Sequence, residues 1–138
     1  MYDVIVVGTD GSDRATEAVD RAVGLADLTG AALHGITVVN TARYGEPALS
    51  SNELVLTELE DRGNEQLEDI RERASDRGID VVTDCFHGEP SREIIAYAQE
   101  HDADLIVLGS HGRTHPDATI GSTADRVLHG TDCEVLVV

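Results

Sequence analysis

Five short apolar runs, each separated from the next by a longer amphipathic segment, constrain the fold of this chain more than any other feature. The runs span residues 3–8, 33–39, 79–86, 105–108 and 134–138. Such runs are typical of parallel strands that helices cover on both faces. Strands that alternate with helices are joined by right-handed crossovers. The pattern therefore predicts an α/β fold, a doubly wound three-layer sandwich on a five-stranded parallel sheet, in one domain over residues 1–138.

The segments between the runs carry helix signals. Ser12 can cap a first helix that Gly30 ends, and a long second helix follows a predicted loop over residues 40–51 and ends at Gly78. Pro90 begins a third helix, where its missing N–H costs nothing, and a fourth covers residues 123–129. Apolar residues at spacings of three and four predict one buried face on each helix. For the first three helices they are Ala15, Ala18, Val19, Ala22, Val23 and Ala26; Leu56, Leu59, Gly63, Leu67, Ile70 and Ala74; and Ile94, Ile95 and Ala98.

The chain has a net charge of −17, from 27 acidic residues against ten basic ones, and it contains no lysine. Acids spread along the helical segments predict a protein of an extreme halophile, because the Debye length is only about 3 Å at 1 M salt. An ordinary acidic protein is the alternative. Nucleic acid is not expected as a partner, because clustered Lys and Arg are absent. The lack of lysine also excludes a Walker A loop and a phosphoacceptor receiver domain.

No run approaches the roughly 18 apolar residues of a membrane span, and the chain starts with a strand rather than a signal peptide. We therefore expect a cytoplasmic protein without membrane association. Cys85 and Cys133 form no Cys-x-x-Cys pair and are predicted to be free thiols. His111 and His115 lie four apart, but Pro116 makes a regular helix between them unfavourable, so no metal site is expected. We find no nucleophile with a base beside it, and so no catalytic residue.

The stretch from Gly109 to Ser122 directly follows the fourth apolar run. Glycines at 109 and 112 allow backbone N–H groups to approach a ligand closely. Gly121-Ser122 opens a helix, whose free N–H groups and positive dipole end suit an anion. The glycine spacing alone is weak evidence for a phosphate site, since the chain has 13 glycines. A predicted strand directly before this stretch and a predicted helix directly after it make a phosphate site the favoured interpretation.

This stretch, with Gly109-Ser-His-Gly112, Gly121-Ser122 and the ending Cys133-Glu-Val-Leu-Val-Val138, resembles the universal stress protein family. Nucleotide-binding members of that family carry Gly-x2-Gly-x9-Gly-Ser/Thr here, whereas this chain has eight residues between the last two glycines. The resemblance spans the whole chain. It implies the strand order 3-2-1-4-5, bound ATP or AMP with or without Mg²⁺, and a homodimer through the last strand.

A sheet of that order binds ligands beyond the carboxyl ends of its first and fourth strands, where the strand order reverses. The residues that follow those two strands would face each other across one crevice. By the resemblance, the backbone of Val38 reads the adenine edge, and Asp10 accepts ribose hydroxyls or holds a metal-bound water. The full set of residues expected to hold the nucleotide is Gly8, Thr9, Asp10, Val38, Gly109, Gly112, Arg113, Gly121, Ser122 and Thr123.

Several of these residues also have a purely structural interpretation. Asp10 can form an Asx turn with Gly11-Ser12, Val38 can be a core valine, and Arg113 can be an exposed loop side chain. Ser122 can be a helix N-cap, which is compatible with a phosphate ligand. We predict a nucleotide-binding stress-response or signalling protein that is not a true enzyme. The alternatives are a dimeric scaffold without nucleotide, which the short glycine loop favours, and a slow ATP hydrolase.

Overall fold

The computed structural model describes residues 2–40, 50–110 and 120–138. The elements in chain order are β1 Val4–Gly8, α1 Asp13–Thr29, β2 Ala32–Val39, α3 Ser50–Asp76, β3 Val81–His87, α4 Pro90–Glu100, β4 Leu105–Leu108, α5 Ser122–Gly130 and β5 Glu134–Val137. The strands form one parallel sheet in the order β3-β2-β1-β4-β5. The predicted fold class and strand order are confirmed.

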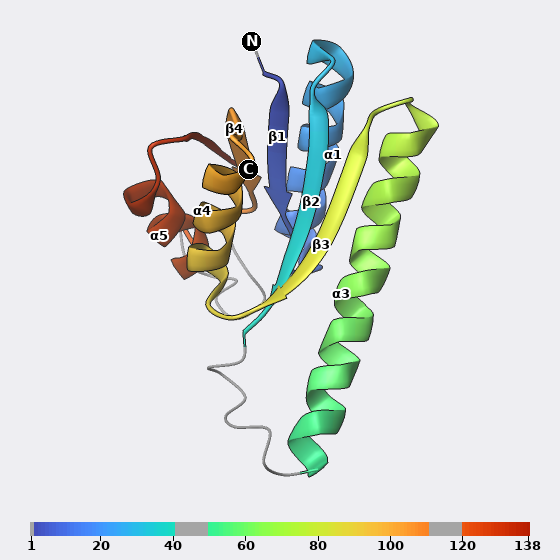
Figure 1. Ribbon diagram of the computed structural model, residues 1–138, viewed down its shortest axis with the longest axis vertical. Coiled ribbons are helices and arrows are strands. Elements are labelled where there is room, and N and C mark those ends of the chain that lie inside the picture. Colours follow the sequence, from blue (N-terminus) through green and yellow to red (C-terminus); the bar gives the residue numbers. More distant parts are fainter. Residues whose placement is uncertain (1, 41–49, 111–119) are drawn as a thin grey trace.

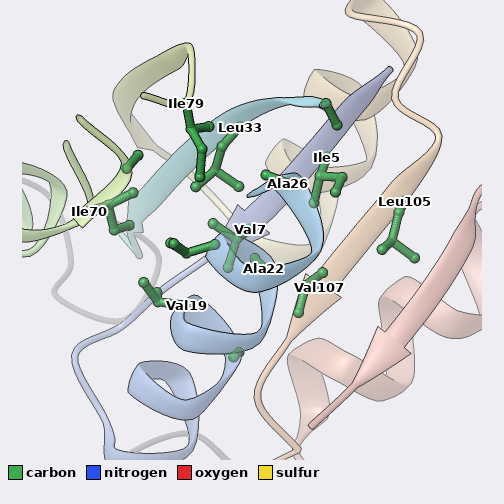
Figure 2. Packing of buried hydrophobic residues seen from close by; sticks show 14 of the residues in the cluster. Ile5, Val7, Val19, Ala22, Ala26, Leu33, Ile70, Ile79, Leu105 and Val107 are labelled. Carbon is green, nitrogen blue, oxygen red and sulfur yellow. The ribbon is translucent and has the colours of Figure 1, made fainter. Parts of the chain in front are cut away.

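Helices α1 and α3 cover one face of the sheet, and α4 and α5 cover the other (Figure 1). Successive strand residues point to opposite faces, so each face has its own apolar layer. Ile5 and Val7 of β1 pack in the layer under α1 and α3, together with Ile70 of α3 (Figure 2). Val6 of β1 packs in the other layer, with Ile94 of α4. The central strand is therefore buried on both faces, as its continuous apolar run predicted.

The ends of α1 agree with its sequence signals. The Ser12 hydroxyl accepts a hydrogen bond from the Ala15 N–H at 3.2 Å. Gly30 has φ +80°, a left-handed conformation that glycine adopts without strain, and its N–H donates to the Ala26 carbonyl at 2.9 Å. All six apolar residues predicted for the buried face of this helix are buried.

Helix α3 differs from its prediction at its beginning. It starts at Ser50, so the predicted loop was too long at its carboxyl end. Serine is common in turns and helix caps, and it is also tolerated in the first turn of a helix. The serines at 50 and 51 therefore do not distinguish the end of a loop from the start of a helix. The first turns of α3 extend past the end of the sheet (Figure 1). For that reason Leu56 is only half-buried and Leu54 is 69% exposed, whereas the predicted core residue Ile70 is buried.

Strand β3 begins at Val81, two residues later than predicted, because the backbone of Ile79 still takes part in the turn that ends α3 at Asp76. The Ile79 N–H donates to the Ala74 carbonyl at 3.0 Å. The prediction for the cysteines is confirmed: Cys85 on β3 and Cys133 just before β5 are free thiols at opposite edges of the sheet.

Candidate functional site

The carboxyl ends of β1 and β4 lie side by side in the middle of the sheet, with Val7 opposite Val107. The segment after β4 also lies directly against the start of α1. A Cβ atom added to Gly109 would lie 2.8 Å from the Ala15 nitrogen and 2.8 Å from the Arg14 carbonyl carbon. The structure thus brings together the two segments that were predicted to face each other, and glycine is required at 109 for this close approach.

The turn from β1 into α1 is held by its own polar groups. The Thr9 N–H donates to the Ile36 carbonyl at 3.0 Å, which fixes the turn to β2. The Thr9 hydroxyl accepts from the Gly11 N–H at 3.2 Å, and an Asp10 carboxylate oxygen accepts from the Ser12 N–H at 2.9 Å. The Asx turn considered for Asp10 is therefore present, and its side chain lies at an exposed position.

Gly8 and Val38 occupy different parts of the same edge. Gly8 is buried at the end of β1, where a Cβ atom would lie 2.9 Å from Leu108 Cδ2 and 3.2 Å from Ile94 Cδ1. Gly8 therefore serves the packing of β1 against β4 and α4. Val38 lies opposite Phe86 of β3, beyond the last residue of β1 that pairs with β2, and is only half-buried.

Helix α5 begins beside the segment that follows β4. Gly121 is its N-cap, with φ −75° and ψ 161°, and the Gly121 N–H donates to the Ser110 carbonyl. The suggestion that Ser122 is the N-cap was wrong, because Ser122 is the first helical residue; Thr123 follows it and is half-buried. No side chain of the described chain caps this helix. Its first N–H groups and positive dipole end therefore remain suited to an anion.

Two of the predicted site residues, Gly112 and Arg113, lie outside the described residues, as do His111, His115 and Pro116. Within the part of the chain that the structure describes, no group of three or more His, Cys, Asp or Glu side chains could hold a metal ion. None of the described helices is long and apolar enough to cross a membrane.

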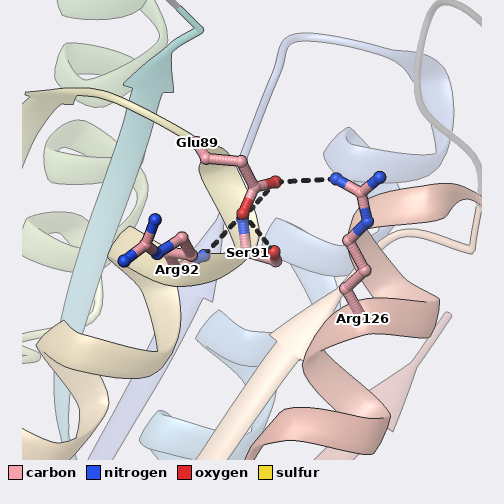
Figure 3. A network of polar contacts seen from close by, with 4 residues as sticks. All are labelled: Glu89, Ser91, Arg92 and Arg126. Atoms are coloured by element: carbon pink, nitrogen blue, oxygen red, sulfur yellow. Dashed lines mark hydrogen bonds and ion pairs between the residues drawn. The ribbon is translucent and has the colours of Figure 1, made fainter. Parts of the chain in front are cut away.

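Sequence reasoning missed a polar network that joins the start of α4 to α5 (Figure 3). The Glu89 carboxylate caps α4, accepting hydrogen bonds from the N–H groups of Ser91 and Arg92 at 3.3 and 3.1 Å. It also accepts from the Ser91 hydroxyl and from Arg126 of α5, the latter at 3.2 Å. Burial opposes the ionisation of Glu89, but these hydrogen bonds together hold its pKa below the ordinary value. Glutamate directly before Pro90 was the available signal for this cap.

The whole chain is similar to proteins of one known family. Residues 1–138 match the sequence model of the universal stress protein family. The chain belongs to this family. Universal stress protein MJ0531 of Methanocaldococcus jannaschii is 37% identical over all of this chain and 82% of its own length.

Solved structures give the same result. The universal stress protein UspA from Lactobacillus plantarum has a TM-score of 0.83 and 34% identity, over 99% of this chain and 97% of that one. A universal stress protein solved in complex with cAMP has a TM-score of 0.74 and 27% identity, over 99% of this chain and 97% of that one.

Proposed function

We propose that this universal stress protein binds an adenine nucleotide in the crevice between β1 and β4, and acts in the cytoplasm in stress response or signalling. One observation carries the proposal. Of the helices that start at this edge, α1 is capped by Ser12 and α4 by Glu89, whereas no described side chain caps α5 at Gly121. Free N–H groups at a helix start bind phosphate. The related structure in complex with cAMP supports an adenine nucleotide as the ligand.

In this proposal the base lies by Val38, and the ribose by Asp10 and Gly109. The phosphates lie over Gly121 and Ser122, beside Thr123, with Gly112 and Arg113 completing the glycine loop. A Mg²⁺ ion that accompanies ATP would meet the carboxylate of Asp10 through water. The net charge of −17 opposes an anion, but molar salt screens this repulsion while the short-range N–H contacts remain.

The test is calorimetry with ATP and with AMP in roughly 2 M KCl, a concentration at which the Debye length is below about 3 Å. Gly121→Asp is expected to abolish binding, because its carboxylate would occupy the anion site. Aspartate is also a favoured N-cap, so α5 is expected to remain folded in this variant. Ser122→Ala is expected to weaken binding by about 1 kcal/mol or more, the scale of a hydrogen bond to a charged group.

Ser75→Ala is the matched control, since Ser75 is exposed on α3 at the end remote from the crevice; it should bind as the wild type does. Absence of wild-type binding to either nucleotide at millimolar concentration would reject the proposal in favour of the scaffold alternative. Release of ADP or phosphate during the titration would instead indicate slow ATP hydrolysis.

We also propose a homodimer through β5. This strand is the edge of the sheet, and an uncovered edge of apolar residues is prone to pair with another chain. On the α1 side, Leu136 and Val138 are only partly buried. A groove of about 460 Å³ lies beside Val138. It is lined by Leu25 and by Leu28, which is 82% exposed, and also by the charged side chains of Glu17, Asp20 and Arg21. Strand addition across a two-fold axis would pair the edge of β5 with a second copy and would cover Leu136 and Val138. Light scattering in high salt that detects only a 14.8 kDa species would exclude the dimer.

A further inference from the structure

Asn40 carries a buried hydrogen-bond acceptor without a partner in the part of the chain that the structure describes. Its side-chain Oδ1 atom is buried and makes no hydrogen bond within the described residues. A buried acceptor left unpaired destabilises a protein measurably, so such groups are few in folded proteins and require an explanation. A ligand that donates a hydrogen bond is one explanation, provided that the atom lies where a ligand binds.

Asn40 lies at the edge of the sheet formed by the carboxyl ends of the strands, where the nucleotide is proposed to bind. Strand β2 runs on after its last pairing with β1, which joins Gly8 to Ile36. The Gly88 N–H donates to the Val39 carbonyl at 2.9 Å, so the last residue of β2 is held by the turn that leads into α4. Asn40 follows immediately, two residues beyond Val38. Two residues of extended chain span about 7 Å, so a base lying against Val38 has its outer edge within reach of the Asn40 amide.

The second unpaired acceptor among the described residues lies elsewhere. The Thr83 hydroxyl is buried in the middle of β3, where its strand neighbour is Gly35, which packs tightly against Ile70 of α3. That position is under a helix and away from the carboxyl ends of the strands. Asn40 alone of these two groups lies at the edge where a ligand is proposed to bind.

We propose that the Asn40 side-chain oxygen accepts a hydrogen bond from the exocyclic amine of adenine, and so selects adenine over hypoxanthine and guanine nucleotides. This inference rests on the proposed nucleotide binding. Adenine carries an amine at the position where the other two purines carry a carbonyl oxygen. An oxygen facing Oδ1 makes no hydrogen bond and is repelled, whereas the amine satisfies the buried acceptor. Sites built around a hydrogen bond discriminate strongly against analogues that cannot make it.

The test is calorimetry with ATP and with ITP, in which the amine is replaced by a carbonyl, in roughly 2 M KCl. The wild type is expected to bind ATP about tenfold or more tightly than ITP, the range of one hydrogen bond. Asn40→Leu, of similar volume but without an acceptor, is expected to bind the two nucleotides about equally. Asn40→Asp keeps a side-chain oxygen and is expected to retain the preference for ATP.

Unfolding curves serve as the folding control. Asn40→Leu removes an unpaired buried acceptor, so its stability is expected to equal or exceed that of the wild type. Equal wild-type affinity for ATP and ITP, or an unchanged ratio in Asn40→Leu, overturns the role of Asn40 while leaving nucleotide binding intact. Failure of the wild type to bind either nucleotide instead rejects the proposed function itself.

Discussion

His34 is a buried histidine in the middle of β2, with only 9% of its surface exposed. Its Nδ1 lies 2.7 Å from the Tyr97 hydroxyl of α4, and its ring centre lies 5.2 Å from that of His101, the residue that directly follows α4. The strand neighbours on either side, Val6 and Val82, are apolar. Burial, and then the positive charge of a protonated His101, lower the pKa of His34 below its ordinary value of 6.5.

We predict that this histidine makes the protein less stable in weak acid. Because its pKa is lower in the folded chain, the unfolded chain binds a proton first, and stability is lost as pH falls through 6.5 toward the folded pKa. His34→Gln, which does not titrate, is expected to flatten the change in unfolding free energy between about pH 7.5 and 5.5. Equal slopes in the wild type and in His34→Gln would contradict the prediction.

The close approach of Gly109 to α1 gives a second prediction for a single residue. Gly109→Ala puts a methyl group 2.8 Å from backbone atoms of Arg14 and Ala15, which cannot move aside as a side chain can. We expect a loss of about 1–3 kcal/mol, the usual cost of overpacking. Gly24→Ala is the matched control, because no atom lies within 4 Å of the added Cβ and the site is inside α1. That variant should gain up to about 1 kcal/mol from helix propensity. Chemical denaturation measures the free energy of unfolding of both variants. A Gly109→Ala variant as stable as the wild type would show that α1 shifts to make room for the added methyl group.

At the scale of elements, Glu89 determines how α4 begins and how it meets α5. Its carboxylate joins an N-cap to an ion pair with Arg126, whose side chain is 61% exposed. The cap is local to α4, whereas the ion pair crosses to the neighbouring helix. The contributions of the cap and of the ion pair to stability can be measured separately, because a variant of Arg126 removes the ion pair and leaves the cap in place.

We predict that Glu89→Ala destabilises the protein by about 1–2 kcal/mol, the cost of a lost N-cap. Arg126→Ala removes only the exposed ion pair and is expected to cost less than about 1 kcal/mol. The two N–H groups donate to different oxygens of Glu89. Glu89→Gln keeps an oxygen for only one of them, and its stability should lie between those of the two alanine variants. Urea unfolding at neutral pH ranks the three variants. An Arg126→Ala variant as unstable as Glu89→Ala would mean that the cross-helix pair, and not the cap, is the main contribution.

At the scale of the whole molecule, the net charge of −17 predicts a stability that depends on salt. Several ion pairs among the described residues are exposed; those of Arg71 with Glu68 and Arg77 with Asp27, for example, have both side chains about half exposed. Exposed pairs contribute little, so salt weakens a small attraction while it screens a larger overall repulsion. The unfolding midpoint should therefore rise between 0.1 M and roughly 2 M KCl. A midpoint that stays constant would reject adaptation to concentrated salt.

The sequence by itself determined the elements, because their signals are local. The strands appear as apolar runs, and the buried face of α1 and its ends at Ser12 and Gly30 follow from spacing and capping within one helix. Shared family motifs then implied the strand order. Even here the start of α3 was set wrongly, since serine suits both a loop and the first turn of a helix.

Only the tertiary structure decided which side chains meet across long stretches of chain. His34 and Tyr97 are separated by 63 residues, and Glu89 and Arg126 by 37. From the sequence, Gly109 was expected only to let a ligand approach the backbone; its close packing against the backbone of α1 appears only in the structure. The unpaired oxygen of Asn40 is also invisible in the sequence, because burial and the lack of a donor depend on every neighbour at once. The spacing of apolar residues predicts on which face of a helix or strand a residue lies. Which side chain it contacts there depends on how the elements pack together.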